Sequence, residues 1–502
     1  MSTKILLISP PELRFQKFIK QTVYFPLGLM YLASMIRDIS DVRILNCLVS
    51  DASPRNQGNM TLIGMTYKEI EKKIREFKPD IVGISVMIFP LLSGAKEISK
   101  ICKKINPKIE VIFGGAYTSV RYGKFLEEGY CDYCVVGEGE KTFREFVEKY
   151  NSKSSLTGIK GIAYKNKNGI LFEPRELIQN LDELPYPAYD LLDMDEYYKY
   201  KMVYNNDLIH LKEMPIISSR GCPYNCVFCA IKKHMGQRWR PHSPEYIIKH
   251  MKYLINKFGI KQFHFLDDNL SANPERFKKI LKGIIPLKIR WNAPYGMRAD
   301  SLSYEILKKM KDAGNTSVQI AIESGNQETL SKIIRKNTSL EKIEEMIKAC
   351  KKLKIKVGAY YIIGFPGETI ETMKQTIDYA VHMLKEYHVS PALYVASPIF
   401  GTELYKECEE KGYVKKNLNE KDLSSATSID GNHLISTEDF NSKDINELIK
   451  YYQNKVKIDY NLKHPIRAAR TFMHMFSKNP VLTLKRVRDT ILNRKINLAK
   501  LK

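Results

Sequence analysis

The chain has 502 residues, a formal net charge of +24, 44% hydrophobic residues and 27% charged residues. This length predicts two or three domains, and the composition is typical of a globular protein, not a disordered one. No uncharged stretch reaches transmembrane length. The N-terminus lacks a secretory pattern, and the nine cysteines are unevenly spaced. Both features predict a cytoplasmic protein in a reducing environment.

Residues 1–150 alternate short apolar runs with amphipathic stretches. The expected helices are 28–38, 67–77, 95–105 and 141–150, and the expected strands are 4–9, 42–46, 81–85, 110–113 and 133–136. This alternation predicts a doubly wound parallel sheet in an α/β domain, covered by helices on both faces. A ligand of such a sheet lies beyond the carboxyl ends of the strands.

The predicted strand ends of this sheet are rich in small residues. Glycines there let a flat ligand approach the backbone closely, although turn glycines without any function are common. Several such ends on one sheet edge favour a pocket. The residues concerned are Ser85, Gly114, Gly115, Gly137, Glu138, Gly139 and Glu140, with Pro26, Leu27 and Gly28 at the start of the first helix.

The remaining chain divides into three parts. Residues 151–210 form a connector with a hairpin at 161–172 and a proline-rich stretch at 181–188. Residues 211–410 return to strand–helix units, and six such units predict a partial (β/α)6 TIM-like barrel with its chemistry at the carboxyl ends of the strands. Residues 411–502 form a helical basic extension. The expected barrel strands are 215–219, 262–266, 289–293, 317–322, 357–363 and 392–396.

Three cysteines follow the first barrel strand with C-x3-C-x2-C spacing: Cys222, Cys226 and Cys229. A closed zinc site needs four protein ligands, whereas three thiolates suit a [4Fe–4S] cluster that keeps one iron open for a ligand. The other six cysteines lack such spacing and are expected to be buried small apolar residues.

Polar or small residues also follow the other barrel strands. Such residues at a strand–helix junction bind ligands or simply cap the next helix. The candidates are Asp267 and Asp268 after the second strand, Arg298 after the third, Glu323 and Ser324 after the fourth, Gly364 after the fifth and Pro398 after the sixth.

The cysteine motif, with the aromatic Phe228 just before its third cysteine, resembles the radical S-adenosylmethionine (SAM) superfamily. The resemblance implies that the thiolates hold the cluster and that SAM chelates the open iron. Reduction then cleaves SAM to a 5′-deoxyadenosyl radical. It also implies SAM contacts at Phe228 and at the seven strand-end candidates. The family usually has proline at the position of Phe400.

The N-terminal half resembles the cobalamin-binding domain of B12-dependent radical SAM enzymes. The matching segments are 8–11, 26–33, 80–85, 113–115 and 137–140. The resemblance implies cobalamin contacts at the ten small, acidic and helix-start residues named above for residues 1–150. All ten histidines lie at or after His210, so this domain offers cobalt no histidine ligand.

The C-terminal segment 461–502 is strongly basic. It holds eleven Lys or Arg residues and one acid, Asp489, interleaved with apolar residues. This pattern predicts basic amphipathic helices, at about 468–477 and 482–492. Such helices suit an anionic membrane surface, here the inner face of the membrane, or form a cap on the barrel.

These features together predict a cobalamin-dependent radical SAM enzyme. The resemblance implies methylation of an unactivated carbon of a lipid, isoprenoid or other natural product. The alternatives are cyclisation, ring rearrangement or oxidation by a B12-binding enzyme, radical SAM chemistry without cobalamin, and a membrane- or nucleic-acid-associated protein with a structural cluster. An external electron donor such as flavodoxin or ferredoxin is expected, and nucleic acid is not.

Overall fold

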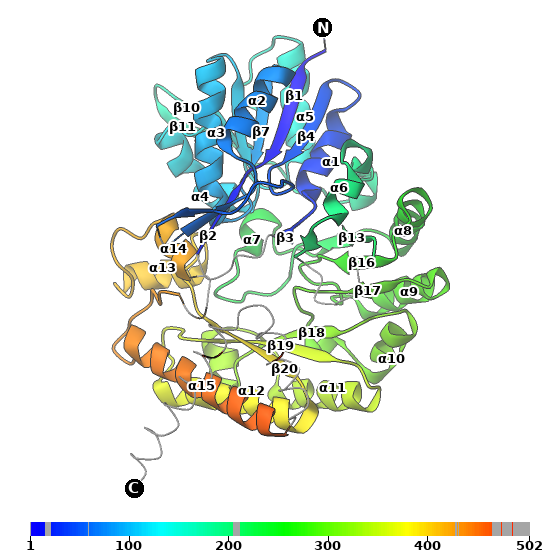
Figure 1. Ribbon diagram of the computed structural model, residues 1–502, viewed down its shortest axis with the longest axis vertical. Helices are drawn as coiled ribbons and strands as arrows, with labels where there is room; N and C mark the ends of the chain where they lie inside the picture. Colours follow the sequence, from blue (N-terminus) through cyan, green and yellow to red (C-terminus); the bar gives the residue numbers. More distant parts are fainter. Residues whose placement is uncertain are drawn as a thin grey trace.

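The computed structural model describes residues 2–15, 22–58, 60–203, 211–426 and 431–463, together with Ile429, Met473 and Leu484. An N-terminal α/β domain stacks on a second domain whose strands are covered by helices on their outer side (Figure 1). The C-terminal helices α13 (Glu403–Glu410), α14 (Glu420–Ala426) and α15 (Ser442–Lys463) run from the junction of the domains along the second one.

The N-terminal domain is built on a seven-stranded sheet in the order β11-β10-β9-β8-β7-β1-β4. Its parallel strands are β1 (Lys4–Ser9), β4 (Asp41–Asn46), β7 (Ile81–Ser85), β8 (Glu110–Gly114) and β9 (Tyr133–Val135). The hairpin predicted in the connector, β10 (Ile162–Asn166) and β11 (Gly169–Phe172), pairs antiparallel with β9 and so extends this sheet.

Helices cover both faces of this sheet. Side chains alternate along β1, so Ile5 and Leu7 enter one buried cluster while Leu6 and Ile8 enter the other. The helices α1 (Leu27–Ile36) and α5 (Glu140–Asn151) pack together, as do α2 (Tyr67–Phe77) and α3 (Leu92–Ile105), and α4 (Ala116–Glu127) packs along β9. The predicted doubly wound sheet is confirmed.

Short strands beyond the main sheet were not predicted. β2 (Glu12–Phe15), β6 (Met60–Ile63) and β5 (Arg55–Gln57) form an antiparallel sheet in the order β2-β6-β5. β3 (Thr22–Val23) pairs with β12 (Lys201–Met202). These strands have two to four residues each, too few for a periodic pattern to identify them. α14 covers β2, so the C-terminal part reaches back to the N-terminal domain.

The second domain contains six parallel strands in two sheets. β13 (Glu213–Ile216), β16 (Gln262–Phe265) and β17 (Arg290–Asn292) form one, and β18 (Val318–Glu323), β19 (Val357–Ile363) and β20 (Ser390–Val395) form the other. Backbone bridges from Trp291 to Asn315 and from Met297 to Ile320 join them. This arrangement confirms the partial barrel. Its outer helices are α8 (Pro244–Phe258), α9 (Pro274–Ile284), α10 (Tyr304–Asp312), α11 (Leu340–Lys352) and α12 (Ile370–Tyr387).

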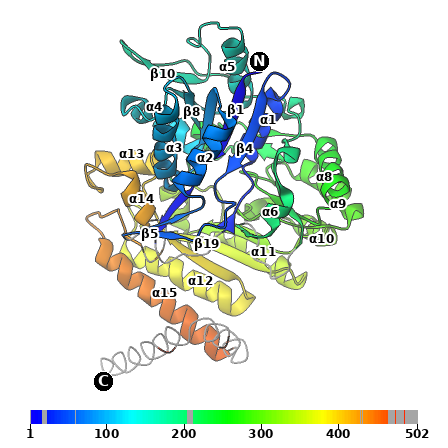
Figure 2. The same cartoon turned by 45° about the horizontal axis from the view of Figure 1, so that its top comes forward.

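The C-terminal helix α15 lies along α12 in both views (Figures 1 and 2). Tyr451 Oη and Lys455 Nζ each donate to Asp378 Oδ1 at 2.8 Å. This described part of the extension is therefore a helical cap on the barrel. The predicted helices at 468–477 and 482–492 lie outside the described residues, apart from the isolated Met473 and Leu484. No helix within the described ranges is long and apolar enough to cross a membrane.

Candidate cofactor site

The three cysteines lie in a loop between two short antiparallel strands, β14 (Ser219–Arg220) and β15 (Arg240–Pro241). Gly221, with a φ of +81°, starts the loop, and a Cβ there would lie 2.5 Å from the Arg238 carbonyl oxygen. The backbone N–H of Val227 donates to the Ile334 carbonyl, and the Val227 carbonyl accepts from Leu404 N–H. Contacts with distant segments thus hold the loop in place.

Asp267 and Asp268, the predicted SAM contacts after β16, both bind the approach to this loop. The Asp267 carboxylate accepts from Ser218 N and from the hydroxyls of Ser218 and Ser219, at 2.6–3.0 Å. Asp268 Oδ2 accepts from Gly221 N at 2.8 Å. Burial raises the pKa of both carboxyls. Asp267 is therefore committed to the loop, while one Asp268 oxygen has no hydrogen-bond partner among the residues that the structure describes.

Arg298 stacks on the cysteine loop. Its guanidinium carbon lies 3.7 Å from the centroid of the Tyr224 ring, within the range of a cation–π contact. Nε and Nη2 donate to the Asp300 carboxylate at 3.0 and 2.5 Å, and Nη2 also donates to the Asn337 carbonyl. The structure thus places this predicted SAM residue directly over the loop, between Cys222 and Cys226.

Glu323 ends β18 with a φ of +72°, which residues with a side chain rarely adopt. Its Oε1 accepts from Lys336 Nζ at 2.9 Å, and Lys336 also donates to the Ala321 carbonyl. Both side chains are buried. Burial raises the pKa of the Cys226 thiol, while Lys336 and Arg298 act in the opposite direction. Two buried cations therefore stand near the cysteine loop and favour a thiolate there.

The remaining predicted SAM residues after β18 and β19 form tight turns. Ser324 Oγ hydrogen-bonds Thr376 Oγ1 of α12 at 2.9 Å and is buried. Gly364 N and Phe365 N donate to Glu368 Oε2 at 2.8 and 2.9 Å. Burial raises the pKa of Glu368 to about 8.

The two other predicted SAM residues are Phe228 and Pro398. Phe228 packs against Phe365, with ring centroids 5.9 Å apart. Pro398 lies in the turn after β20 and is buried. Phe400, two residues later, enters the core of the N-terminal domain, where Arg121 stands 4.0 Å from its ring. An aromatic residue at that position therefore seals the domain junction.

The cysteine residues fit an iron–sulfur cluster by their chemistry and placement. All three are free and partly exposed, while the other six cysteines are buried. Burial raises the pKa of all three thiols, for Cys229 to about 12. No set of three metal-binding side chains in the described part of the chain converges on a single ion. In a cluster the thiolates bind different irons, so Cys222, Cys226 and Cys229 would hold it without such convergence.

The carboxyl edge of the N-terminal sheet forms a backbone cradle. Gly115 has a φ of +104°, and a Cβ there would lie 2.9 Å from the Val86 carbonyl oxygen. Gly137 N donates to Ser119 Oγ at 2.9 Å, and Ser85 and Gly114 are half-buried neighbours in β7 and β8. Among the described residues, a Cβ on Gly114 or Gly137 would have no neighbour closer than 3.7 Å. The backbone at these two glycines is therefore unobstructed, as a corrin ring would need.

Two exposed apolar side chains border this cradle. Met87 and Ile88, directly after β7, are 43% and 45% exposed. The Met87 sulfur would lie 3.1 Å from a Cβ on Gly115. Their exposed apolar surface is available to a ligand bound at this edge. These side chains were not predicted, although Met87 follows the predicted strand and its position was a usable signal.

Other predicted cobalamin residues lie elsewhere. Gly28 is exposed, but Pro26 and Leu27 are buried, and Leu27 joins a core shared with the barrel. Gly139 is half-buried against the Leu32 side chain. Glu138 and Glu140 are buried, and their carboxylates bind Arg220 and Arg240, not the open edge. Their predicted role as cobalamin contacts has no support from their side-chain positions.

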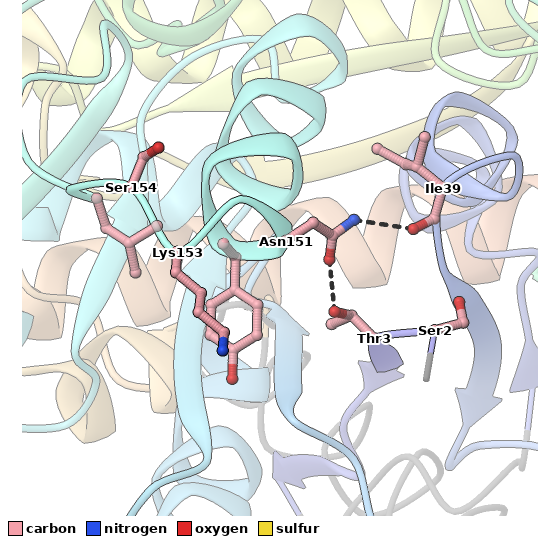
Figure 3. Close-up of a pocket in the computed structure, with 8 residues that line it drawn as sticks. Ser2, Thr3, Ile39, Asn151, Lys153 and Ser154 are labelled. Atoms are coloured by element: carbon pink, nitrogen blue, oxygen red, sulfur yellow. Dashed lines mark hydrogen bonds between the residues drawn. The ribbon is translucent and has the colours of Figure 1, made fainter.

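An open pocket of about 630 Å³ lies at the opposite, amino end of the same sheet (Figure 3). Asn151 Nδ2 donates to the Ile39 carbonyl at 2.9 Å, and Thr3 bonds Asn151 Oδ1. Ligands of parallel sheets bind beyond the carboxyl ends. This pocket is therefore separate from the cofactor edge.

Three important residues were not predicted as parts of the site: Arg220, Lys336 and Glu368. Each is buried, and a buried charged residue must find a partner distant in sequence. Glu368 could have been identified from the sequence, because it lies in the turn at 364–369 that follows the fifth predicted barrel strand. Arg220 adjoins the cysteine motif, which made it a candidate by position. Nothing in the sequence distinguishes Lys336 from the many other lysines.

Comparisons with known proteins agree with this geometry. The radical SAM superfamily matches residues 216–380, and the B12 binding domain matches residues 21–147. The uncharacterized methyltransferase PH0819 of Pyrococcus horikoshii is 34% identical over 475 residues, covering 94% of this chain and 95% of the relative. Cytidylyl-2-hydroxyethylphosphonate methyltransferase of Streptomyces wedmorensis is 28% identical over 444 residues, covering 82% of each.

A solved structure shares the architecture. OxsB, a cobalamin-dependent SAM radical enzyme with aqua-cobalamin and SAM bound, matches with a TM-score of 0.69 at 18% identity. The match covers 93% of this chain and 68% of that chain. At this identity the likeness shows a common fold.

Proposed function

The chain belongs to the cobalamin-dependent radical SAM methyltransferase family, and from this premise we propose that it methylates an unactivated carbon of a small molecule. Its cofactors are a [4Fe–4S] cluster, SAM and cobalamin. When bound, the cluster and SAM supply hydrogen-atom abstraction, and cobalamin supplies methyl transfer.

The observation that carries this proposal is the apposition of the two cofactor surfaces. The short helix α7 (Ile231–His234), which follows Cys229, packs on α4 of the N-terminal domain. A Cβ on Gly137, at the glycine-lined edge, would lie 3.9 Å from the His234 carbonyl oxygen. The cysteine loop therefore adjoins the edge that would hold cobalamin, as consecutive hydrogen abstraction and methyl transfer on one carbon require.

The substrate side of the proposal rests on tyrosines of the barrel strands. Tyr361 is fully buried, so alternation along β19 directs Tyr360 to the barrel interior. The Tyr360 hydroxyl donates to the Pro294 carbonyl at 2.7 Å, and its ring lies 6.0 Å from the Tyr394 ring. Tyr295 and Tyr394 are 61% and 45% exposed. We assign the rings of Tyr295, Tyr360 and Tyr394 to substrate contact. Their hydroxyls would meet polar groups of the substrate, and their ring faces would meet apolar or flat groups.

The class of substrate is a further part of the proposal, because membership of the family does not define it. The expectation of a lipid, isoprenoid or other natural product remains a proposal. The named relative acts on a cytidylyl phosphonate, and the aromatic interior fits a nucleotide-linked small molecule as well as an isoprenoid. A flavodoxin or ferredoxin as electron donor and contact of the basic tail with a membrane are further parts of the proposal.

The test is anaerobic reconstitution with iron, sulfide, cobalamin, a reductant and SAM that carries a deuterated methyl group. A small-molecule extract of the source cells serves as the substrate pool. We expect 5′-deoxyadenosine, S-adenosylhomocysteine and one product that gains the labelled methyl. Cyclisation, rearrangement or oxidation gives 5′-deoxyadenosine without label in the product, and this result would reject methylation.

Two alanine variants control this experiment. Cys226→Ala removes a proposed cluster ligand and is expected to reduce 5′-deoxyadenosine to background. Cys350→Ala removes a buried barrel cysteine of α11 and is expected to retain iron and activity. Equal loss of 5′-deoxyadenosine in both variants would mean that the Cys226→Ala result reflects misfolding. Equal retention would show that Cys226 is not a ligand of the cluster.

A further inference from the structure

A buried cluster of four charges joins the two domains. Arg220 donates from Nη1 to Glu138 Oε1 at 2.9 Å and from Nη2 to Glu140 Oε1 at 2.6 Å. Arg240 donates from Nη1 to both Glu138 oxygens at 2.9 and 2.8 Å. Glu138 and Glu140 follow β9 of the N-terminal sheet, while the arginines belong to β14 and β15, the strands that flank the cysteine loop.

All four side chains are shielded from water, with exposed fractions between 2% and 7%. Burial opposes ionisation of Glu140, yet Arg220 lowers its pKa, so the pair is charged in the folded protein. Removing charges from water costs free energy that ion pairing often fails to recover. A buried ion pair is therefore weak evidence for stability, and a requirement for defined geometry is the better explanation of these charges.

The surroundings of the cluster fix its orientation. Glu138 Oε2 also accepts from Ile178 N at 2.7 Å, and Arg240 donates to the carbonyls of Ile178 and Met235. The guanidinium carbon of Arg220 stands 5.4 Å from the Tyr31 ring of α1. A planar guanidinium that bridges two carboxylates sets both distance and angle.

We propose that Glu138, Glu140, Arg220 and Arg240 form a positioning latch that fixes the cysteine loop relative to the cobalamin-facing edge of the N-terminal sheet. Arg220 precedes Gly221 and Cys222 directly, and Gly137 lies beside Glu138. A shift of this cluster therefore moves both cofactor surfaces relative to each other. The proposal of a latch rests on the proposed binding of both cofactors and is independent of which carbon the enzyme methylates.

The decisive test is the double variant Arg220→Met/Glu140→Leu, studied as the holoenzyme. It replaces one charged pair by apolar residues of similar size and leaves the Arg240–Glu138 pair intact. Pulsed electron paramagnetic resonance measures the distance between cob(II)alamin and the reduced cluster. We expect unchanged cofactor content and thermal stability, but a mean distance shifted by about 1 Å or more, a displacement that can reduce catalysis about a hundredfold.

Hydrogen exchange gives a second readout. Residues 218–242 and 133–142 of the double variant are expected to exchange together, about tenfold faster than in the wild type, because they open as one unit. The outer helices α10 and α11 are expected to keep their protection. Faster exchange throughout the barrel would instead indicate general destabilisation and would overturn the latch.

Matched variants keep the test decisive. Glu148→Gln, on the same helix α5, removes an exposed partner of Arg144 and is expected to leave the distance unchanged. Arg220→Lys keeps the charge but loses the fork that bridges two carboxylates, and it is read in place of the double variant if that variant does not fold. The proposal is overturned if the double variant keeps the wild-type distance between the cofactors. If the double variant does not fold, a wild-type distance in Arg220→Lys overturns it. The measurement of the distance between the cofactors needs no substrate, so it can be interpreted even if the protein does not methylate.

Discussion

Lys336 donates from Nζ to Glu323 Oε1 at 2.9 Å, and each side chain is only 6% exposed. Glu323 holds a left-handed backbone conformation at the end of β18, and Lys336 also binds the Ala321 carbonyl of the same strand. This buried pair fixes a strand end that adjoins Cys226. It also shows how the barrel retains charge beside the cofactor site.

Substitution of one partner should therefore cost more than substitution of both. Lys336→Met leaves the Glu323 carboxylate buried without its cation, and we expect a loss of about 3–5 kcal/mol in folding free energy. Lys336→Met/Glu323→Leu should recover most of it. Thermal unfolding of the apoprotein measures both. A single variant as stable as the double variant would show that the pair is open to water.

The Arg298–Tyr224 contact should stabilise the cysteine loop. Arg298→Ala removes a cation–π contact of about 0.5–2 kcal/mol and the partner of Asp300. We expect faster loss of iron from the reconstituted protein when it is exposed to a chelator, measured by the decay of the cluster absorbance. Lys352→Ala, which removes a cation 5.4 Å from the Tyr304 ring on the outer helices, is the control. Equal decay rates in the two variants would contradict this role.

Glu368 should make stability pH-dependent. Its pKa in the folded protein is about 8 because of burial, well above its ordinary value of 4.5. Between these values the folded state binds more protons than the unfolded state, so stability falls as pH rises through this window. Glu368→Gln should reduce the decrease in Tm between pH 6 and pH 8.5. Glu371→Gln, exposed in the first turn of α12, should retain the full decrease, and a Glu368→Gln profile that matches it would contradict the prediction.

Met87 should contribute to cobalamin retention. Met87→Glu places a charge where a corrin ring would cover the cradle, and we expect a large loss of co-purified cobalamin absorbance because the charge would be desolvated. Leu171→Glu introduces the same charge at a side chain of equal 43% exposure on β11, and it should leave the cobalamin content unchanged. Retention of cobalamin by Met87→Glu would place the cofactor away from this residue.

Local patterns predicted most of the architecture. The bounds of α2 agree with the predicted 67–77, and α8 and α9 are equally regular. These helices have capping residues and regular apolar spacing within one segment. The C-x3-C-x2-C motif is equally local, since three ligands within eight residues define the cluster chemistry without reference to the rest of the chain.

Tertiary structure alone decided the partners of the acidic residues. Asp267 binds the approach to the cysteine loop, and Glu138 and Glu140 bind arginines 80 to 102 positions away. A carboxylate has the same appearance in sequence whether it caps a helix, meets a cofactor or pairs with a buried cation. Its role follows from which groups folding brings within hydrogen-bond distance after water is excluded. The sequence by itself determined the chemistry of the cysteine loop, and the packing of two domains decided what holds that loop in place.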